Sequence, residues 1–264
     1  MDTNLRGQCF LITGASGGIG LATARLFAEE GARLVLHYRS QERPLREYLD
    51  ATKADAVALQ ADLREQAEVE RLFSAALKKH PRIDGLIANA GIFPEQPVPL
   101  HAMSLEQWQN TISADLDSTF LTCRAFLRHV AETPRESASI VLVGSTSALF
   151  GEEGHADYSA AKAAMTYGLT RTLKNEIVRL APRGRVNCVC PGWTRTPMAE
   201  YGLRDAAAVQ RVQATMALRK IATAEDVAAA IAYLASDRLA GHLSGTILPV
   251  AGGMEGRLLH SPAL

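Results

Sequence analysis

The feature that most limits what this chain can fold into is a glycine-rich segment set between an apolar run and an amphipathic stretch. Gln8–Thr13 predicts a short strand, and Ile19–Glu30 predicts a helix that ends at Gly31. The segment that joins them reads Thr13-Gly14-Ala15-Ser16-Gly17-Gly18-Ile19-Gly20. Such a turn lets the backbone approach a bound group and points the free N–H groups of the helix toward it. The segment therefore predicts a strand–turn–helix unit that binds the pyrophosphate of a nucleotide.

Strand-like and helix-like patterns alternate along the rest of the chain. Further strands are predicted at Arg33–His37, Ala56–Gln60, Gly85–Ala88, Ser139–Val143, Arg185–Cys190 and Thr246–Val250. Further helices are predicted at Arg43–Thr52, Glu65–Lys79, 104–131, Ala156–Leu180 and Ala224–Ala235. The strands are short, unbroken apolar runs, which is typical where helices cover both faces of a sheet. The pattern predicts an α/β fold with a Rossmann-type doubly wound parallel sheet of about seven strands, in one domain over residues 1–264.

The composition argues against several classes of protein. Of the 264 residues 47% are hydrophobic, and the formal net charge is zero, which is not the charge pattern of a nucleic-acid or anionic-membrane binder. No apolar run of about 18 residues predicts a membrane span, and residues 1–6 do not read as a signal peptide. We therefore expect a cytoplasmic protein with reduced thiols. Cys188 and Cys190 are expected in the core rather than in a metal site, so no metal is expected.

The residues after the second predicted strand indicate which nicotinamide cofactor such a site prefers. A carboxylate there binds the ribose hydroxyl of NAD(H), whereas a cation accommodates the 2′-phosphate of NADP(H). The segment contains Tyr38, Arg39 and Ser40, and no acidic residue lies between Gly31 and Gln41. Because a guanidinium can pair with a phosphate, NADP(H) is favoured and NAD(H) remains possible.

Three polar side chains predict proton transfer beside this cofactor. Tyr158 and Lys162 lie four residues apart in a predicted helix, so they project from the same face. A free tyrosine has a pKa of about 10, and a nearby ammonium favours its phenolate. Ser145 precedes them and can hydrogen-bond a substrate oxygen on which charge develops. The three residues predict general acid–base catalysis by tyrosine during hydride transfer to or from a carbonyl.

Taken in order, these motifs resemble the short-chain dehydrogenase/reductase family over essentially the whole chain. The matching residues are the glycine turn, Asp62-Leu63, Asn89-Ala90-Gly91, Ser145, Tyr158, Lys162 and Pro191-Gly192. Within the family, the chain resembles members of the 3-oxoacyl-carrier-protein reductase type. The resemblance implies that Asp62 contacts the adenine, that Asn89 stabilises the sheet and lines the cofactor, and that 191–196 holds the nicotinamide. Members that prefer NADP(H) often carry a second basic residue where this chain has Gly17.

The expected cofactor-binding residues come from six segments of the chain. They are Gly14, Ser16, Gly17, Gly18, Ile19, Gly20, Tyr38, Arg39, Ser40, Asp62, Leu63, Asn89, Ala90, Gly91, Tyr158, Lys162, Pro191, Gly192, Thr194 and Thr196.

One expected catalytic position departs from the family pattern. Where the family has an asparagine that helps to anchor a water near the lysine, this chain has Asp115. An aspartate there should stabilise the Lys162 ammonium and oppose formation of the Tyr158 phenolate. We therefore expect activity with a shifted pH optimum. The alternative is that Asp115 only caps a kink in its helix.

The substrate wall is expected from three segments: the loop after Gly91, residues 147–155, and a lid over about 193–218. His155 is interpreted as a loop residue rather than a catalytic one. The surplus apolar surface of the two long predicted helices favours a homotetramer, with a homodimer as the alternative.

The chain is thus expected to be an NADP(H)-dependent carbonyl reductase or secondary-alcohol dehydrogenase that acts on a small molecule. One alternative is an NAD-dependent dehydrogenase of a sugar, polyol or secondary-metabolite alcohol. Another is a catalytically silent nucleotide-binding regulatory protein.

Overall fold

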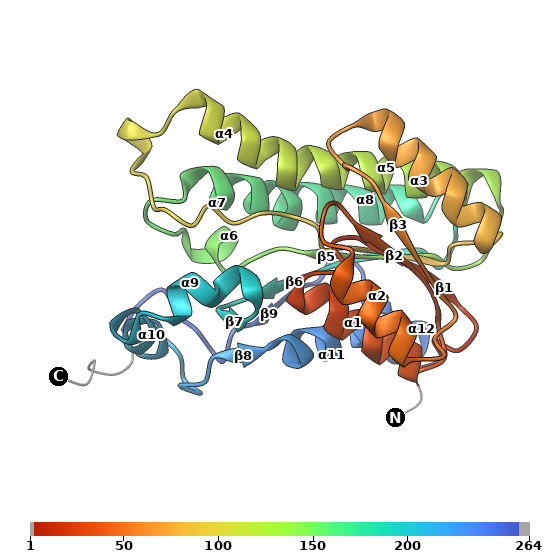
Figure 1. The fold of residues 1–264 in the computed structure, drawn as a ribbon. Coiled ribbons are helices and arrows are strands. Elements are labelled where there is room, and N and C mark those ends of the chain that lie inside the picture. The colour runs from red at the N-terminus through yellow and green to blue at the C-terminus, as the bar shows by residue number, and fades with distance from the viewer. Residues whose placement is uncertain (1–2, 259–264) are drawn as a thin grey trace.

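A seven-stranded parallel sheet forms the centre of the structure, a computed structural model that describes residues 3–258 (Figure 1). Its strands are β1 (Cys9–Ile12), β2 (Arg33–Tyr38), β3 (Ala56–Gln60), β4 (Gly85–Ala88), β5 (Ser139–Val143), β6 (Arg185–Pro191) and β9 (Ile247–Val250). Their spatial order is β3-β2-β1-β4-β5-β6-β9, and every neighbouring pair is parallel. This order confirms the predicted doubly wound sheet, because the direction of winding reverses between β1 and β4.

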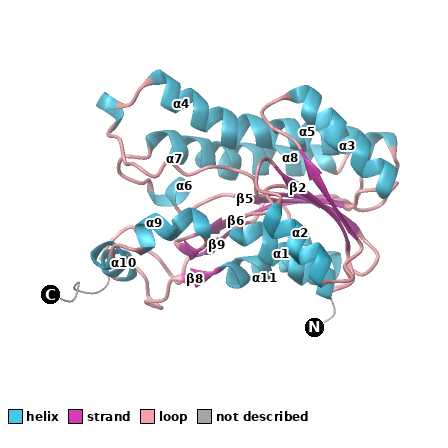
Figure 2. Ribbon diagram, viewed as in Figure 1, coloured by secondary structure: helices cyan, strands magenta, loops and turns pink. Residues whose placement is uncertain are grey.

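Helices cover both faces of the sheet (Figures 1 and 2). One face carries α3 (Gln66–Lys79), α4 (Leu105–Ile112), α5 (Ser118–Glu132), α7 (Ala156–Ala163) and α8 (Thr170–Ile177). The other carries α1 (Gly18–Glu29), α2 (Arg43–Ala51), α11 (Ala224–Ala235) and α12 (Asp237–Ala240). The buried apolar runs of the strands therefore meet helices on either side, as their sequence pattern predicted.

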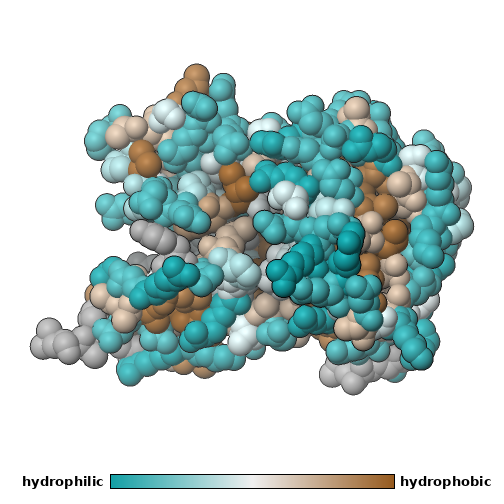
Figure 3. All heavy atoms as spheres, viewed as in Figure 1, coloured by the Kyte–Doolittle hydropathy of each residue, from teal (hydrophilic) through white to brown (hydrophobic). Residues whose placement is uncertain are grey.

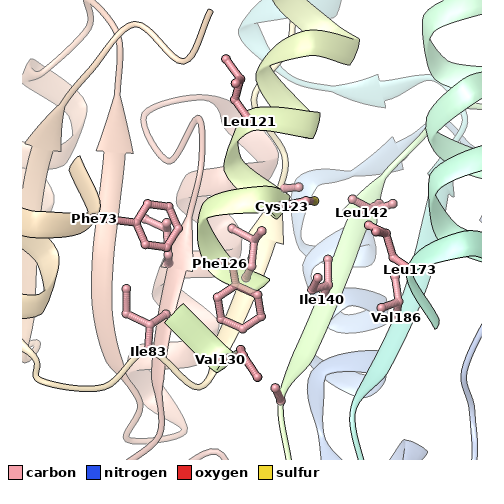
Figure 4. Close-up of a cluster of buried hydrophobic side chains, with 14 of the residues drawn as sticks. Phe73, Ile83, Leu121, Cys123, Phe126, Val130, Ile140, Leu142, Leu173 and Val186 are labelled. Atoms are coloured by element: carbon pink, nitrogen blue, oxygen red, sulfur yellow. The ribbon is translucent and has the colours of Figure 1, made fainter. Parts of the chain in front are cut away.

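The core consists of two large apolar clusters, one on each face of the sheet. The first packs α3, α5 and α8 against the strands and includes Phe73, Phe126 and Ile140 (Figure 4). The second packs α1 and α11 against the opposite face and includes Phe10 and Phe27, whose rings meet edge to face at 4.8 Å. Removal of these side chains from water supplies the main stabilisation and fixes where the loops leave the sheet.

Both long helices differ from the prediction in the same way. The predicted helix over 104–131 is interrupted by a π-helical turn, η2 (Ser113–Asp117), between α4 and α5. The predicted Ala156–Leu180 helix is interrupted by another, η3 (Ala164–Leu169), between α7 and α8. A π turn inserts one residue without ending the helix, and such insertions are frequent at functional sites. Here the first insertion places Asp115 in the buried interior.

The remaining elements are short and were not predicted. They are η1 (Leu100–Ala102), α6 (Ser147–Phe150), β7 (Thr194–Arg195), η4 (Pro197–Ala199), α9 (Glu200–Leu203), α10 (Ala206–Gln213) and β8 (Ala222–Thr223). Strands β7 and β8 pair in parallel and close the base of the segment over 193–218 that we expect to act as a lid. Helices α9 and α10 form the body of that segment and lie opposite α7 (Figure 1).

Cys188 and Cys190 are fully buried on β6, in agreement with their interpretation as core thiols. Over residues 3–258, no helix is long and apolar enough to cross a membrane. The same residues contain no cluster of three or more His, Cys, Asp or Glu side chains that could hold a metal ion.

Candidate active site

A cavity of about 900 Å³ opens at the carboxyl edge of the sheet, where the strand order reverses. Its lining includes most of the residues that the sequence predicted, drawn from every segment that was expected to contribute. They are Gly14, Ser16, Gly17, Gly18, Ile19, Arg39, Ser40, Asp62, Leu63, Asn89, Ala90, Gly91, Ser145, Tyr158, Lys162, Pro191, Gly192, Thr194 and Thr196. In Figure 3 the molecule is indented on the side where α9 and α10 lie opposite α4 and α7.

Three residues of the predicted site lie outside this lining. Gly20 packs inside the glycine turn, where a Cβ would come within 2.3 Å of the Gly14 carbonyl oxygen. Tyr38 is half-buried against the apolar cluster of α1 and α11 rather than in the cavity. Asp115 is fully buried behind Gly91. The structure thus gives Gly20 and Tyr38 packing positions and leaves Asp115 to act through its neighbours.

Hydrogen bonds between the loops after β1 and β4 hold the floor of the cavity together. The Thr13 hydroxyl accepts from the backbone N–H groups of Asn89 at 2.9 Å and Ala90 at 3.0 Å. The Asn89 side-chain amide donates to the carbonyl oxygens of Thr13 at 3.0 Å and Gly14 at 3.2 Å. These bonds satisfy polar groups at the point where the two halves of the sheet diverge, in agreement with the stabilising role that the resemblance implied for Asn89.

A buried histidine that the sequence analysis did not assign ties three strand ends together. The backbone N–H of Gly14 donates to His37 Nδ1 at 3.1 Å, so the ring must be neutral with its proton on Nε2. His37 Nε2 then donates to the Ala61 carbonyl oxygen at 3.0 Å. Burial lowers the pKa of His37, which agrees with a neutral ring. In the sequence, His37 could have been recognised as a functional position because it is a polar residue inside an otherwise apolar strand.

The N-terminus of α1 is shaped for an anion. Its cap residue, Gly17, has an extended backbone, and in the described part of the chain no side chain caps this helix end. Free N–H groups and the positive end of the helix dipole therefore face the cavity. Thr196 closes over this end, because a Cβ at Gly18 would lie 2.6 Å from the Thr196 methyl group. The narrow gap and the uncapped helix fit the pyrophosphate of a dinucleotide.

Two arginines and a carboxylate surround the far end of the cavity. Arg39 and Ser40 follow β2 and line this end. Arg64, which the sequence analysis did not single out, also lines it and forms a bidentate ion pair with Asp62, in which Nε donates to Oδ1 at 2.9 Å and Nη2 donates to Oδ2 at 2.5 Å. The Arg64 guanidinium, and more weakly Arg39, lower the pKa of Asp62. This end of the cavity therefore presents cations to a ligand.

Ser145, Tyr158 and Lys162 lie together in one wall of the cavity, which we call its chemical end. The Lys162 ammonium lies 5.5 Å from the centre of the Tyr158 ring and donates to the Val143 carbonyl oxygen at 3.3 Å. Burial raises the pKa of Tyr158, the Lys162 ammonium opposes that rise, and the Asp115 carboxylate adds to it. Ser145 also favours the phenolate through its hydroxyl. Because its pKa is raised, the phenol is neutral near neutral pH and lies beside a cation.

Asp115 supplies the counter-charge for Lys162. Its Oδ1 accepts from the Ile92 backbone N–H at 2.6 Å, and its Oδ2 lies 3.9 Å from Lys162 Nζ. Oδ2 has no hydrogen-bond partner among residues 3–258. Burial raises the pKa of Asp115, against the effects of the Lys162 ammonium and the Ile92 N–H. Burial alone would lower the pKa of Lys162, but Asp115 and Tyr158 outweigh it and the pKa is raised.

Two loops join to form the substrate side of the cavity. His155 stacks on Phe93 with ring centroids 4.5 Å apart, and Phe93 meets Tyr158 edge to face at 5.1 Å. Both ring nitrogens of His155 face carbonyl oxygens, those of Glu153 at 3.1 Å and Pro94 at 3.0 Å. The ring is therefore occupied in joining the loops, which supports its interpretation as a loop residue.

Comparison with known proteins agrees with this geometry. A family model described as "Enoyl-(Acyl carrier protein) reductase" matches residues 14–255. The chain is 36% identical to a 3beta-hydroxysteroid dehydrogenase 1 of Eggerthella lenta, over 96% of both chains. It is also 36% identical to a 3-oxoacyl-[acyl-carrier-protein] reductase of Synechocystis sp., over 96% of this chain and 98% of the relative. The crystal structure of a levodione reductase superposes with a TM-score of 0.87 at 30% identity, over 95% of this chain and 98% of that one.

Proposed function

Because the chain belongs to the short-chain dehydrogenase/reductase family, we propose that it is an NADP(H)-dependent oxidoreductase acting on a small carbonyl compound or secondary alcohol. The observation that carries the proposal is the convergence of Ser145, Tyr158 and Lys162 on a cavity that also contains an uncapped helix N-terminus. A nucleotide-binding regulator would need only the second of these features.

Each polar side chain at the chemical end has a separate task. The bound nicotinamide supplies or accepts the hydride. Ser145 hydrogen-bonds the substrate oxygen and stabilises the charge that develops there. The Tyr158 hydroxyl gives its proton to that oxygen during reduction, and the phenolate takes a proton from the alcohol during oxidation. The Lys162 ammonium favours the phenolate and keeps the phenol oriented toward the cavity.

Replacing Tyr158 by phenylalanine separates turnover from binding. Tyr158→Phe removes the proton donor but keeps the ring that Phe93 contacts. We expect kcat to fall by about a hundredfold or more, with the dissociation constant for NADPH almost unchanged. A panel of ketones assayed with both cofactors, together with fluorescence titration of NADPH, measures the two quantities. Unchanged turnover in Tyr158→Phe would contradict the proposed function.

The cations at the far end of the cavity support a preference for NADP(H). Arg39 lies at the end of β2, where a 2′-phosphate is recognised in this fold, and Arg64 lines the same end. We expect Arg39→Ala to weaken NADPH binding by about tenfold and to change NADH binding little, since one charge-assisted hydrogen bond is lost. Isothermal titration with each cofactor measures both effects. An equal loss for the two cofactors would argue against 2′-phosphate recognition.

The buried Asp115 carboxylate is proposed as a positioning residue that shifts the pH dependence. Its negative charge raises the pKa of Tyr158, so Asp115→Asn should lower that pKa. Oxidation of an alcohol needs the phenolate, and its pH–rate profile should therefore move to lower pH in Asp115→Asn. Asp117→Asn is the matched control, because Asp117 is exposed two residues further along the same helix. Superimposable profiles for the wild type and Asp115→Asn would contradict this role for Asp115.

We also propose a homotetramer. Phe120 on α5, Tyr167 on η3 and Val178 after α8 remain 47%, 40% and 42% exposed. Arg124 lies 5.1 Å from the Phe120 ring and Arg171 lies 5.2 Å from the Tyr167 ring, so two aromatic–arginine pairs face outward. Contact between copies through these helices would cover that apolar surface. Light scattering of the purified chain measures the mass, and a monomer would contradict the assembly.

A further inference from the structure

Hydrogen bonds between two loops hold together the wall of the cavity where we expect the substrate to bind. The loop after β4 is joined to the loop 151–155 by the Val98 N–H, which donates to the Gly154 carbonyl oxygen at 2.8 Å. Gly154 has φ +78°, and a Cβ there would lie 2.5 Å from the Pro97 side chain. With the His155 contacts already described, this bond holds the backbone that directly follows Glu152.

Glu152 and Glu153 are adjacent in the chain but differ in their exposure to solvent. Glu152 is half-buried and lines the cavity, whereas Glu153 is exposed and lies outside the lining. Within residues 3–258 the Glu152 side chain makes no hydrogen bond or ion pair, although the charge of His155 acts on it. Burial raises the pKa of Glu152, as expected for a carboxyl group partly removed from water. An acceptor without a fixed partner is therefore available to whatever fills the cavity.

Glu152 is one of two glutamates that line the cavity. Glu95, in the loop after β4, also lines the cavity and is exposed. The cation on the lid, Arg204, forms an ion pair with Glu200 at 2.7 Å and is exposed. Lys162 is balanced by Asp115. Apart from His155, whose charge acts on Glu152 directly, the cations of the cavity are thus paired or lie at its far end.

The other side chains on this side are largely apolar, among them Phe93, Trp193 and Met198. A carboxylate in such surroundings repels an anion and accepts a hydrogen bond from a hydroxyl or amide. Building on the proposed function, we infer that Glu152 is a specificity-determining residue: it selects uncharged carbonyl or alcohol substrates that carry a second hydrogen-bond donor, and it excludes carboxylates.

Two ligands of nearly equal shape test the inference. 4-Oxocyclohexanecarboxamide is uncharged and has an N–H donor, whereas 4-oxocyclohexanecarboxylate is anionic and has none. Binding of each to the NADPH-saturated enzyme is measured by isothermal titration, under conditions where turnover is blocked by Tyr158→Phe. We expect the amide to bind at least about tenfold more tightly than the acid, because like charges repel at close range.

Glu152→Gln removes the charge but keeps the size of the side chain, and it should bring the two affinities to within about threefold of each other. Glu153→Gln is the matched control and should keep the original ratio. Equal binding of both ligands in the parent, an unchanged ratio in Glu152→Gln, or binding of neither ligand would overturn the inference. The proposed function is tested separately by the ketone panel, so the two can fail independently.

Discussion

The burial of one ammonium group is the constraint on which the chemical end of this structure depends. Lys162 is 4% exposed, and an ion that is so far removed from water must be compensated by nearby negative charge or acceptors. The Val143 carbonyl oxygen and the Asp115 carboxylate supply that compensation. Both π-helical turns lie in the helices that bring Asp115 and Lys162 together. The π-helical turn η2 thus contains the carboxylate that compensates Lys162.

The two ends of the cavity differ in charge. Arg39 and the Arg64–Asp62 ion pair lie at one end, and Glu152 lies toward Tyr158 at the other. Between them lie the helix N-terminus of α1 and the Tyr158 phenol. A phosphorylated ligand is therefore attracted to one end only, while the other end favours uncharged molecules. This asymmetry connects the cofactor preference and the substrate preference that we propose.

Much of the fold was predictable, because short apolar runs and amphipathic stretches alternate with clear glycine and proline ends. The cavity lining was also largely predictable from the order of the motifs. The π turns were not, since one inserted residue leaves the apolar pattern of a helix almost unchanged. Tyr38 and Gly20 were assigned to the cofactor from their place in a motif, but the pleat of β2 and the packing of the glycine turn direct them elsewhere. Arg64 was not predicted, because its place in the cavity lining depends on its ion pair with Asp62 across a turn.

The central claim is that the buried Asp115–Lys162 pair sets the ionisation of Tyr158. The most direct measurement is an ultraviolet titration of tyrosinate, with the spectrum of Tyr158→Phe subtracted so that only Tyr158 contributes. We expect the phenol to ionise at lower pH in Asp115→Asn than in the wild type, because one negative charge beside it has been removed. Ionisation at the same pH in both proteins, or at higher pH in Asp115→Asn, would contradict the account.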